Sequence, residues 1–203
     1  MELHTTLTSP FGLMARIVIL EKGLSDRIPV IEAKTRTIDS PYYAINPSGR
    51  VPYLICDDGT GLEESQLICA YLDHLDAAPM LDHPGGEAGW ESRRLEALAR
   101  SMLDGISVWG REFYRPDGEQ SPTIVAHEMA RTRRMVDVWE KEIGHPLMNG
   151  ALNMAQLTLA VTLQIEHRLD GFEFRTSHPG LAAWAVRQST RPSFKELLPH
   201  LAD

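Results

Sequence analysis

Ser9 and Pro10 are the first pair of residues whose types and order suit chemistry. Serine caps helices well and proline is favoured at the first helical position, so the pair predicts a helix that begins here. The N-terminus of a helix stabilises an anion through its free N–H groups and its dipole. A serine hydroxyl there can also donate to a thiolate, and one such bond of about 1.5–3 kcal/mol lowers a thiol pKa by about one or two units. Ser9 is therefore either a plain N-cap or part of a corner that turns a bound thiol into a nucleophile.

Two later residue pairs, Val51-Pro52 and Glu64-Ser65, also have an ordinary structural interpretation beside a possible functional one. Val51-Pro52 fits a proline at the first residue of an edge strand, and since only about 5–6% of such bonds are cis, the pair alone predicts no cis peptide. Glu64-Ser65 fits an acidic strand end followed by an N-cap. It also fits a site where the helix start and Ser65 bind a carboxylate while Glu64 binds an ammonium. A carboxylate and an ammonium on one carbon make an amino-acid head group.

The elements that position these pairs fall in the first 80 residues. Alternating patterns predict strands at Glu2–Thr6, Ile28–Glu32 and Val51–Cys56, with a short fourth strand that ends at Glu64 after an Asp-Gly turn. Helices are predicted after Ser9 and after Glu64. A strand–helix–strand start implies parallel pairing and the hairpin adds antiparallel strands, so the sequence predicts a small mixed sheet.

The rest of the chain shows only helical periodicity. Apolar residues recur every three or four positions over 95–113 and 125–143, which suits an antiparallel helix pair. A third, largely apolar helix should follow Asn153, with Gln156 completing a capping box. Pro179 and Pro192 should lie near the first turns of two shorter helices.

Composition excludes several classes of protein. The 203 residues are 43% hydrophobic and 24% charged, which is ordinary globular usage, and the net charge of −8 argues against a nucleic-acid binder. No apolar run is long enough to span a membrane and no signal peptide is evident, so we expect a cytoplasmic protein without membrane association. Cys56 and Cys69 are predicted to be reduced, buried thiols, and the histidines show no metal-ligand spacing, so no metal is predicted.

Four segments, in order, carry a resemblance that covers essentially the whole chain. They are Ser9-Pro10-Phe11-Gly12 with Arg16–Leu24, Asn46-Pro47-Ser48-Gly49-Arg50-Val51-Pro52-Tyr53-Leu54, Leu62-Glu63-Glu64-Ser65-Gln66-Leu67-Ile68 with Tyr71-Leu72, and His178–Trp184 with Arg191–Phe194. Together they resemble the glutathione S-transferase family, and the Ser-Pro-Phe sequence is most similar to its serine-type classes, such as the plant tau class and several bacterial groups. Asn153 and Gln156 stand where the family usually has Ser or Thr and Asp.

The resemblance implies a fold and a set of domains. It implies an α/β thioredoxin-like, glutathione-binding domain with a small mixed sheet over residues 1–78, a linker over 79–86, and an all-α helical domain over 87–203. It also implies a homodimer.

The resemblance also implies roles for individual residues. Val51-Pro52 would be the cis-proline of the family, with the Val51 backbone on the cysteinyl part of glutathione. Glu64 and Ser65 would hold the γ-glutamyl end, and Arg50 would meet the glycyl carboxylate. Ser9 would activate the thiol, although Thr5, Thr6 and Thr8 lie near the same turn and remain rivals. Phe11 and Trp109 are candidates to line the site of the second substrate, and for both the alternative is an ordinary core position.

The reaction type follows from the residue at position 9. A cysteine there would form a mixed disulfide with glutathione, which a serine cannot do, so conjugation is favoured over disulfide exchange. The expectation is a detoxifying glutathione transferase that joins its co-substrate glutathione to small, largely apolar electrophiles. The alternatives are a non-catalytic glutathione-binding or scaffold protein, and a specialised glutathione-dependent isomerase, peroxidase or dehalogenase.

Overall fold

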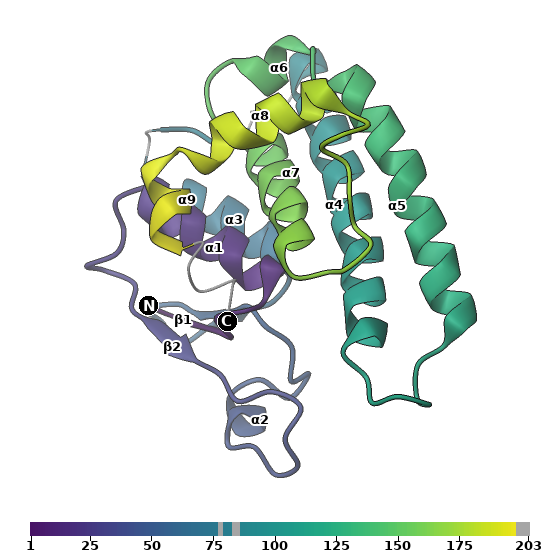
Figure 1. Ribbon diagram of the computed structural model, residues 1–203. Helices are drawn as coiled ribbons and strands as arrows, with labels where there is room; N and C mark the ends of the chain where they lie inside the picture. The colour runs from purple at the N-terminus through teal and green to yellow at the C-terminus, as the bar shows by residue number, and fades with distance from the viewer. Residues whose placement is uncertain (77–78, 83–85, 198–203) are drawn as a thin grey trace. The chain divides into compact units, whose positions relative to one another are not determined.

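The computed structural model describes residues 1–76, 79–82 and 86–197 (Figure 1). The residues group into two compact units, Met1–Asp82 with Pro192–Asp203, and His83–Arg191. The predicted linker, 79–86, includes residues 83–85 outside the described part, so the predicted domain limits stay a prediction. The last described helix groups with the first unit, although its sequence position lies within the predicted helical domain.

The first unit is built on a four-stranded mixed sheet. Its elements are β1 (Glu2–Thr5), α1 (Pro10–Glu21), β2 (Val30–Glu32), α2 (Tyr42–Ile45), β3 (Tyr53–Ile55), β4 (Gly61–Leu62), α3 (Ser65–Asp73) and α9 (Pro192–Leu197). The strand order is β2-β1-β3-β4. Leu3 of β1 lies opposite Val30 of the parallel β2 and opposite Leu54 of the antiparallel β3. The mixed sheet expected from the sequence is therefore present.

Helices α1 and α3 pack against each other in this unit (Figure 1). Leu13 and Ile17 of α1 and Ile68 and Leu72 of α3 are all buried, with at most 1% of each side chain exposed. Burying a side chain of this size contributes about 1.5–3 kcal/mol, so these apolar positions drive the pairing of the two helices. The pairing fixes the N-terminal ends of both helices, where the candidate site residues lie.

A buried ion pair joins the far ends of the same two helices. Lys22, the C-cap of α1, places Nζ 3.1 Å from Oδ1 of Asp73, and both side chains are fully buried. Asp73 also accepts hydrogen bonds of 2.9 Å from the backbone N–H groups of Leu81 and Asp82. Burial by itself lowers the pKa of Lys22, but hydrogen bonds to Asp76 and Asp73 outweigh it, and the net pKa is raised. The ammonium is therefore firmly charged at neutral pH.

The second unit is all-helical within its described residues. Its elements are α4 (Glu87–Phe113), α5 (Pro122–Glu142), α6 (Pro146–Asn149), α7 (Met154–Gln164), the 3₁₀ turn Ile165–His167 and α8 (Pro179–Ser189). Helix α4 packs against both α5 and α7 (Figure 1). Every residue of α7 is buried, as its apolar sequence predicts for a central helix.

The start of α7 shows how the predicted cap works. Asn153 Oδ1 accepts a 3.0 Å hydrogen bond from the Gln156 N–H, which confirms Asn153 as the N-cap. The Gln156 side chain behaves differently from the capping-box prediction, since its Nε2 donates to the carbonyl oxygens of Leu147 and Ala151 at 2.7 and 3.0 Å. The Gln156 amide therefore ties the turn before α7 to the helix.

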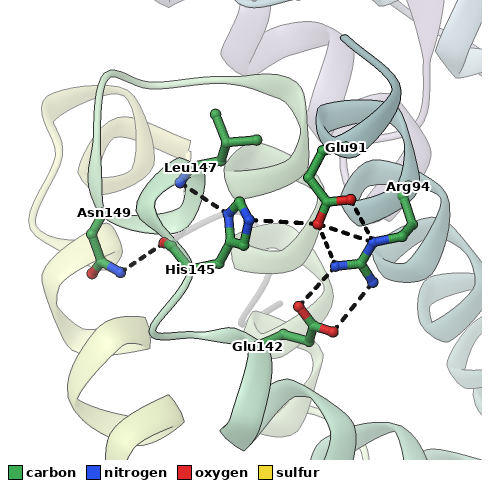
Figure 2. A network of polar contacts seen from close by, with 6 residues as sticks. All are labelled: Glu91, Arg94, Glu142, His145, Leu147 and Asn149. Atoms are coloured by element: carbon green, nitrogen blue, oxygen red, sulfur yellow. Dashed lines mark hydrogen bonds and ion pairs between the residues drawn. The ribbon is translucent and has the colours of Figure 1, made fainter. Parts of the chain in front are cut away.

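A surface network links α4 to the end of α5 (Figure 2). Arg94 bonds Glu91 on its own helix at 2.6 Å and Glu142 of α5 at 2.9 Å. Hydrogen bonding to Arg94 lowers the pKa of Glu91. His145 Nδ1 accepts from the N–H of Leu147 at 3.1 Å, which makes it the N-cap of α6, while its Nε2 lies 3.5 Å from Glu91. The network thus holds α6 to the helix pair.

Among the described residues, no helix combines the length and apolar character that crossing a bilayer requires.

Candidate active site

Ser9 caps α1, as its sequence predicts. Its backbone is extended, with φ −70° and ψ 120°, and Oγ accepts a 3.2 Å hydrogen bond from the N–H of Gly12, while Pro10 occupies the first turn. The hydroxyl oxygen is thus used as an acceptor, and its proton is left for another group at the start of the helix. The half-buried hydroxyl of Ser9 therefore lies at the positive end of the α1 dipole.

The turn between β1 and α1 is too tight for a side chain at position 12. A Cβ on Gly12 would lie 1.8 Å from Thr5 Oγ1, so only glycine allows the strand and helix to approach this closely. Thr5 is wholly buried, and its hydroxyl donates to the Thr6 carbonyl at 3.2 Å. Of the three threonines near this turn, Thr6 is half-buried and Thr8 is exposed, so these two remain accessible rivals of Ser9.

Val51-Pro52 is a cis peptide bond at the entry to β3. The loop before it is anchored through the Arg50 carbonyl, which accepts hydrogen bonds from Tyr42 Oη and from Asn46 Nδ2. Burial raises the pKa of Tyr42, which keeps its hydroxyl protonated as a donor. Tyr42 could not be predicted in this role from the sequence, because it lies in the four-residue helix α2, which is too short to show apolar periodicity.

Glu64 has an unusual backbone at the start of α3. Its φ is +66° with ψ 119°, in a region that residues other than glycine rarely adopt. Such conformations cost about 1–3 kcal/mol and cluster at functional sites. Ser65, which follows, is buried and is the first residue of α3, so the N-terminal end of this helix begins directly after Glu64.

Arg50 and Glu64 are brought together by the fold. Arg50 Nη1 lies 3.6 Å from Glu64 Oε1, and each side chain is 75% exposed. An ion pair this exposed is worth about 0–1 kcal/mol, so it is easily exchanged for ligand groups of opposite charge. One surface thus offers a guanidinium, a carboxylate and a helix N-terminus.

Phe11 and Trp109 belong to different units. Phe11 is half-buried in the first turn of α1, close in sequence to Ser9. Trp109 is 2% exposed near the end of α4, and its ring packs edge-on against Phe172 with centroids 6.4 Å apart. Trp109 therefore has the burial of a core residue within the helical unit.

Both cysteines of the chain belong to the first unit. Cys56 and Cys69 are buried and form no disulfide with each other, as expected from the sequence; Cys56 directly follows β3 and Cys69 lies in α3. Over the described residues, no group of three or more His, Cys, Asp or Glu side chains is arranged to hold a metal ion.

The mixed sheet with its cis-proline and the separate helical unit are the architecture of a thioredoxin-like domain followed by an all-helical domain. Comparison with known proteins gives the same class. A family model described as "Glutathione S-transferase, N-terminal domain" matches residues 8–75. The GST-like protein YibF of Escherichia coli K12, which is described as uncharacterized, is 30% identical over 201 residues, covering 99% of this chain and 93% of YibF.

Solved structures agree over nearly the full length. A glutathione transferase family member from Pseudomonas fluorescens Pf-5, with bound glutathione, is 26% identical with a TM-score of 0.88 and 97% coverage of both chains. A glutathione S-transferase from Methylobacillus flagellatus, with glutathione bound, is 26% identical with a TM-score of 0.87, covering 97% of this chain and 98% of that one. The chain belongs to the glutathione S-transferase family.

Proposed function

We propose that the protein is a glutathione transferase that joins the glutathione thiolate to small, largely apolar electrophiles. The observation that carries the proposal is the position of Ser9, whose hydroxyl stands at the N-terminus of α1 with its oxygen bonded to Gly12. A thiolate beside this turn is stabilised by the dipole of α1 and by the Ser9 proton. The lowered thiol pKa makes the anion available at neutral pH.

The remaining predicted residues hold the rest of the tripeptide. Glu64 offers a carboxylate to the ammonium of the γ-glutamyl group, while Ser65 and the first N–H groups of α3 receive its carboxylate. Arg50 pairs with the glycyl carboxylate, and the Val51 backbone before the cis-proline contacts the cysteinyl part. The bound glutathione in the two similar structures supports glutathione as the ligand.

In the proposed reaction the thiol proton passes to solvent, and the sulfur forms a bond to an electrophilic carbon. A leaving group departs with its electron pair, or the electrons move onto an activated acceptor. Serine forms no disulfide with glutathione, so conjugation is favoured over thiol exchange. Phe11 is proposed to line the second-substrate site from the first unit, and Trp109 is proposed as a further lining residue from the second.

The proposal also covers the cellular location and the oligomeric state of the protein. We propose a cytoplasmic enzyme that acts in detoxification as a homodimer. Two large apolar side chains, Leu67 of α3 and Trp90 of α4, are 53% and 69% exposed, as expected for residues that a second copy covers.

Calorimetry with glutathione tests binding, and a panel of electrophiles that includes chlorodinitrobenzene tests conjugation. We expect glutathione to bind with a Kd in or below the millimolar range, and we expect turnover of at least one electrophile. Binding without turnover across the panel would identify a non-catalytic glutathione-binding protein. One metabolite turned over far faster than every general electrophile would identify a specialised isomerase, peroxidase or dehalogenase. The absence of any binding heat would overturn the proposal.

A further inference from the structure

A hydrogen bond joins the two segments that carry the proposed glutathione residues. Ser48 Oγ donates to Glu63 Oε1 at 2.6 Å, across 15 residues of sequence. Ser48 lies two residues before Arg50, and Glu63 directly precedes Glu64. The bond therefore extends the connection between β3 and β4, which ends at Leu62, as far as the proposed ligand-binding residues.

The hydroxyl of Ser48 is used twice. Besides donating to Glu63, its oxygen accepts a hydrogen bond of 3.2 Å from the Arg50 N–H. The Ser48 N–H in turn donates to Asn46 Oδ1 at 3.1 Å, and Asn46 Nδ2 donates to the Arg50 carbonyl at 3.0 Å. Because both backbone polar groups of Arg50 are held in this way, the position of Glu63 is transmitted through Ser48 to Arg50.

Glu63 also restricts the backbone of Glu64. The φ of +66° at Glu64 is a conformation that persists only where the surrounding structure holds it. On the C-terminal side it is held by α3, since the Glu64 carbonyl accepts a 3.0 Å hydrogen bond from the Ile68 N–H. On the N-terminal side the Glu63 side chain is fixed by Ser48. The bond between Ser48 and Glu63 therefore acts on both charged residues of the proposed site.

A second contact between the two segments is given up in the proposed complex. Arg50 Nη1 and Glu64 Oε1 lie 3.6 Å apart in the structure. In the proposed function these groups turn to the glycyl carboxylate and the γ-glutamyl ammonium, so their mutual ion pair is exchanged for ligand charges. The bond between Ser48 and Glu63 uses neither charged group of that pair, so it can stay formed when glutathione is bound.

We propose that Ser48 and Glu63 are positioning residues, which hold Arg50 and Glu64 at the spacing of the two charged ends of glutathione. The inference deepens the proposed function and rests on it, because this spacing matters only to a ligand that binds both residues. A site that is already ordered loses less conformational freedom on binding, and this raises the affinity. Loss of one such hydrogen bond predicts glutathione binding about 2- to 10-fold weaker.

Calorimetry with glutathione tests the bond through a double-mutant cycle. The variants are Ser48→Ala, Glu63→Ala and the double variant, and each single change should weaken binding about 2- to 10-fold. The double variant should bind about as weakly as the weaker of the single variants, because both changes remove the same bond. Unchanged affinity in either single variant, or effects that multiply in the double variant, would overturn the proposal.

Conservative variants separate the hydrogen bond from charge and bulk. Ser48→Thr keeps the hydroxyl and Glu63→Gln keeps an oxygen acceptor without the negative charge, so both should retain most of the wild-type affinity. If Glu63→Gln binds as weakly as Glu63→Ala, the charge of Glu63 is responsible and the positioning role is wrong. Ser25→Ala and Asp26→Ala are matched controls that should leave the affinity unchanged, because these exposed residues follow the C-terminal end of α1.

Thermal unfolding and kinetics show whether the effect is merely structural. Both side chains are exposed, so Ser48→Ala and Glu63→Ala should unfold near the wild-type temperature, and a large fall in Tm would assign the bond to folding and overturn the proposal. With an electrophile that is turned over, the KM for glutathione should rise while kcat at saturating glutathione stays close to wild type, because the start of α1 around Ser9 is unchanged. A fall in kcat without a change in KM would contradict a positioning role.

The wild-type titration separates this inference from the proposed function. If wild type binds glutathione and the two alanine variants bind it equally well, only the positioning role is wrong. If wild type gives no binding heat, the proposed function is wrong, and this inference falls with it.

Discussion

Replacing Ser9 with alanine removes two interactions that different measurements separate. The first is the cap, in which Oγ accepts from Gly12 at 3.2 Å, and its loss should lower the free energy of unfolding by about 0.5–2 kcal/mol. The second is the proposed bond from the hydroxyl to the thiolate, worth about 1.5–3 kcal/mol. At about 1.36 kcal/mol per unit, the pKa of bound glutathione should rise by about one to two units.

Titrating the ultraviolet absorbance of the thiolate in the complex measures this pKa directly. If the pKa returns to the free-thiol value of about 8.5 from one to two units below it, the ionised fraction at pH 7 falls about 8- to 25-fold. Turnover should fall by the same factor, while glutathione affinity changes little. Ser9→Asp is the matched variant, because aspartate caps helices as well as serine does. It should restore stability but not turnover, since a carboxylate beside the sulfur raises the thiol pKa further.

Two results would refute this reasoning. If Ser9→Asp restores both stability and turnover, Ser9 is only a cap. If Ser9→Ala leaves the thiol pKa unchanged, the anion is stabilised by another group, and the accessible hydroxyls of Thr6 and Thr8 become the next candidates.

Two further predictions concern the backbone of Glu64 and the buried ion pair. Glu64→Gly and Glu64→Ala both remove the carboxylate and should weaken glutathione binding about tenfold in calorimetry, but urea unfolding should find the glycine variant more stable by about 1 kcal/mol, because only glycine adopts φ +66° freely. Equal stability would mean that this φ carries no strain. Lys22→Met should lower stability by about 3–5 kcal/mol at neutral pH, because it leaves Asp73 buried without its cation. Since the pKa of Lys22 is raised above 10.5, its contribution is complete below that pH and is lost as the pH rises through the raised value. Wild type should therefore lose stability in strong alkali, and a variant that shows the same loss would contradict this origin.

Elements with local signals could be predicted from the sequence. Ser9 with Pro10 fixed the start of α1, and Asn153 fixed the start of α7, because caps are recognised by residue type alone. Strand ends were less predictable. The second and third strands begin two residues later than expected, at Val30 and Tyr53, and the cis-proline directly precedes the third.

Short helices had no signal that the sequence could offer. Helices α2 and α6 contain four residues each, too few for apolar periodicity, and neither was predicted. Their consequences reach the candidate site, because Tyr42 of α2 anchors the loop before Val51.

At the proposed glutathione site, the residue at position 64 is not the one that folding stability favours. At position 64 stability alone favours glycine, because φ +66° costs a residue with a side chain about 1–3 kcal/mol. The ion pair between Glu64 and Arg50 stabilises the fold by about 0–1 kcal/mol, because both side chains are 75% exposed. It does not offset the conformational cost of the positive φ. A carboxylate held in a strained conformation at the start of α3 is thus unexplained by folding. A positively charged ligand group explains it, and the ammonium of an amino-acid head group bound beside the helix N-terminus has the required charge and place.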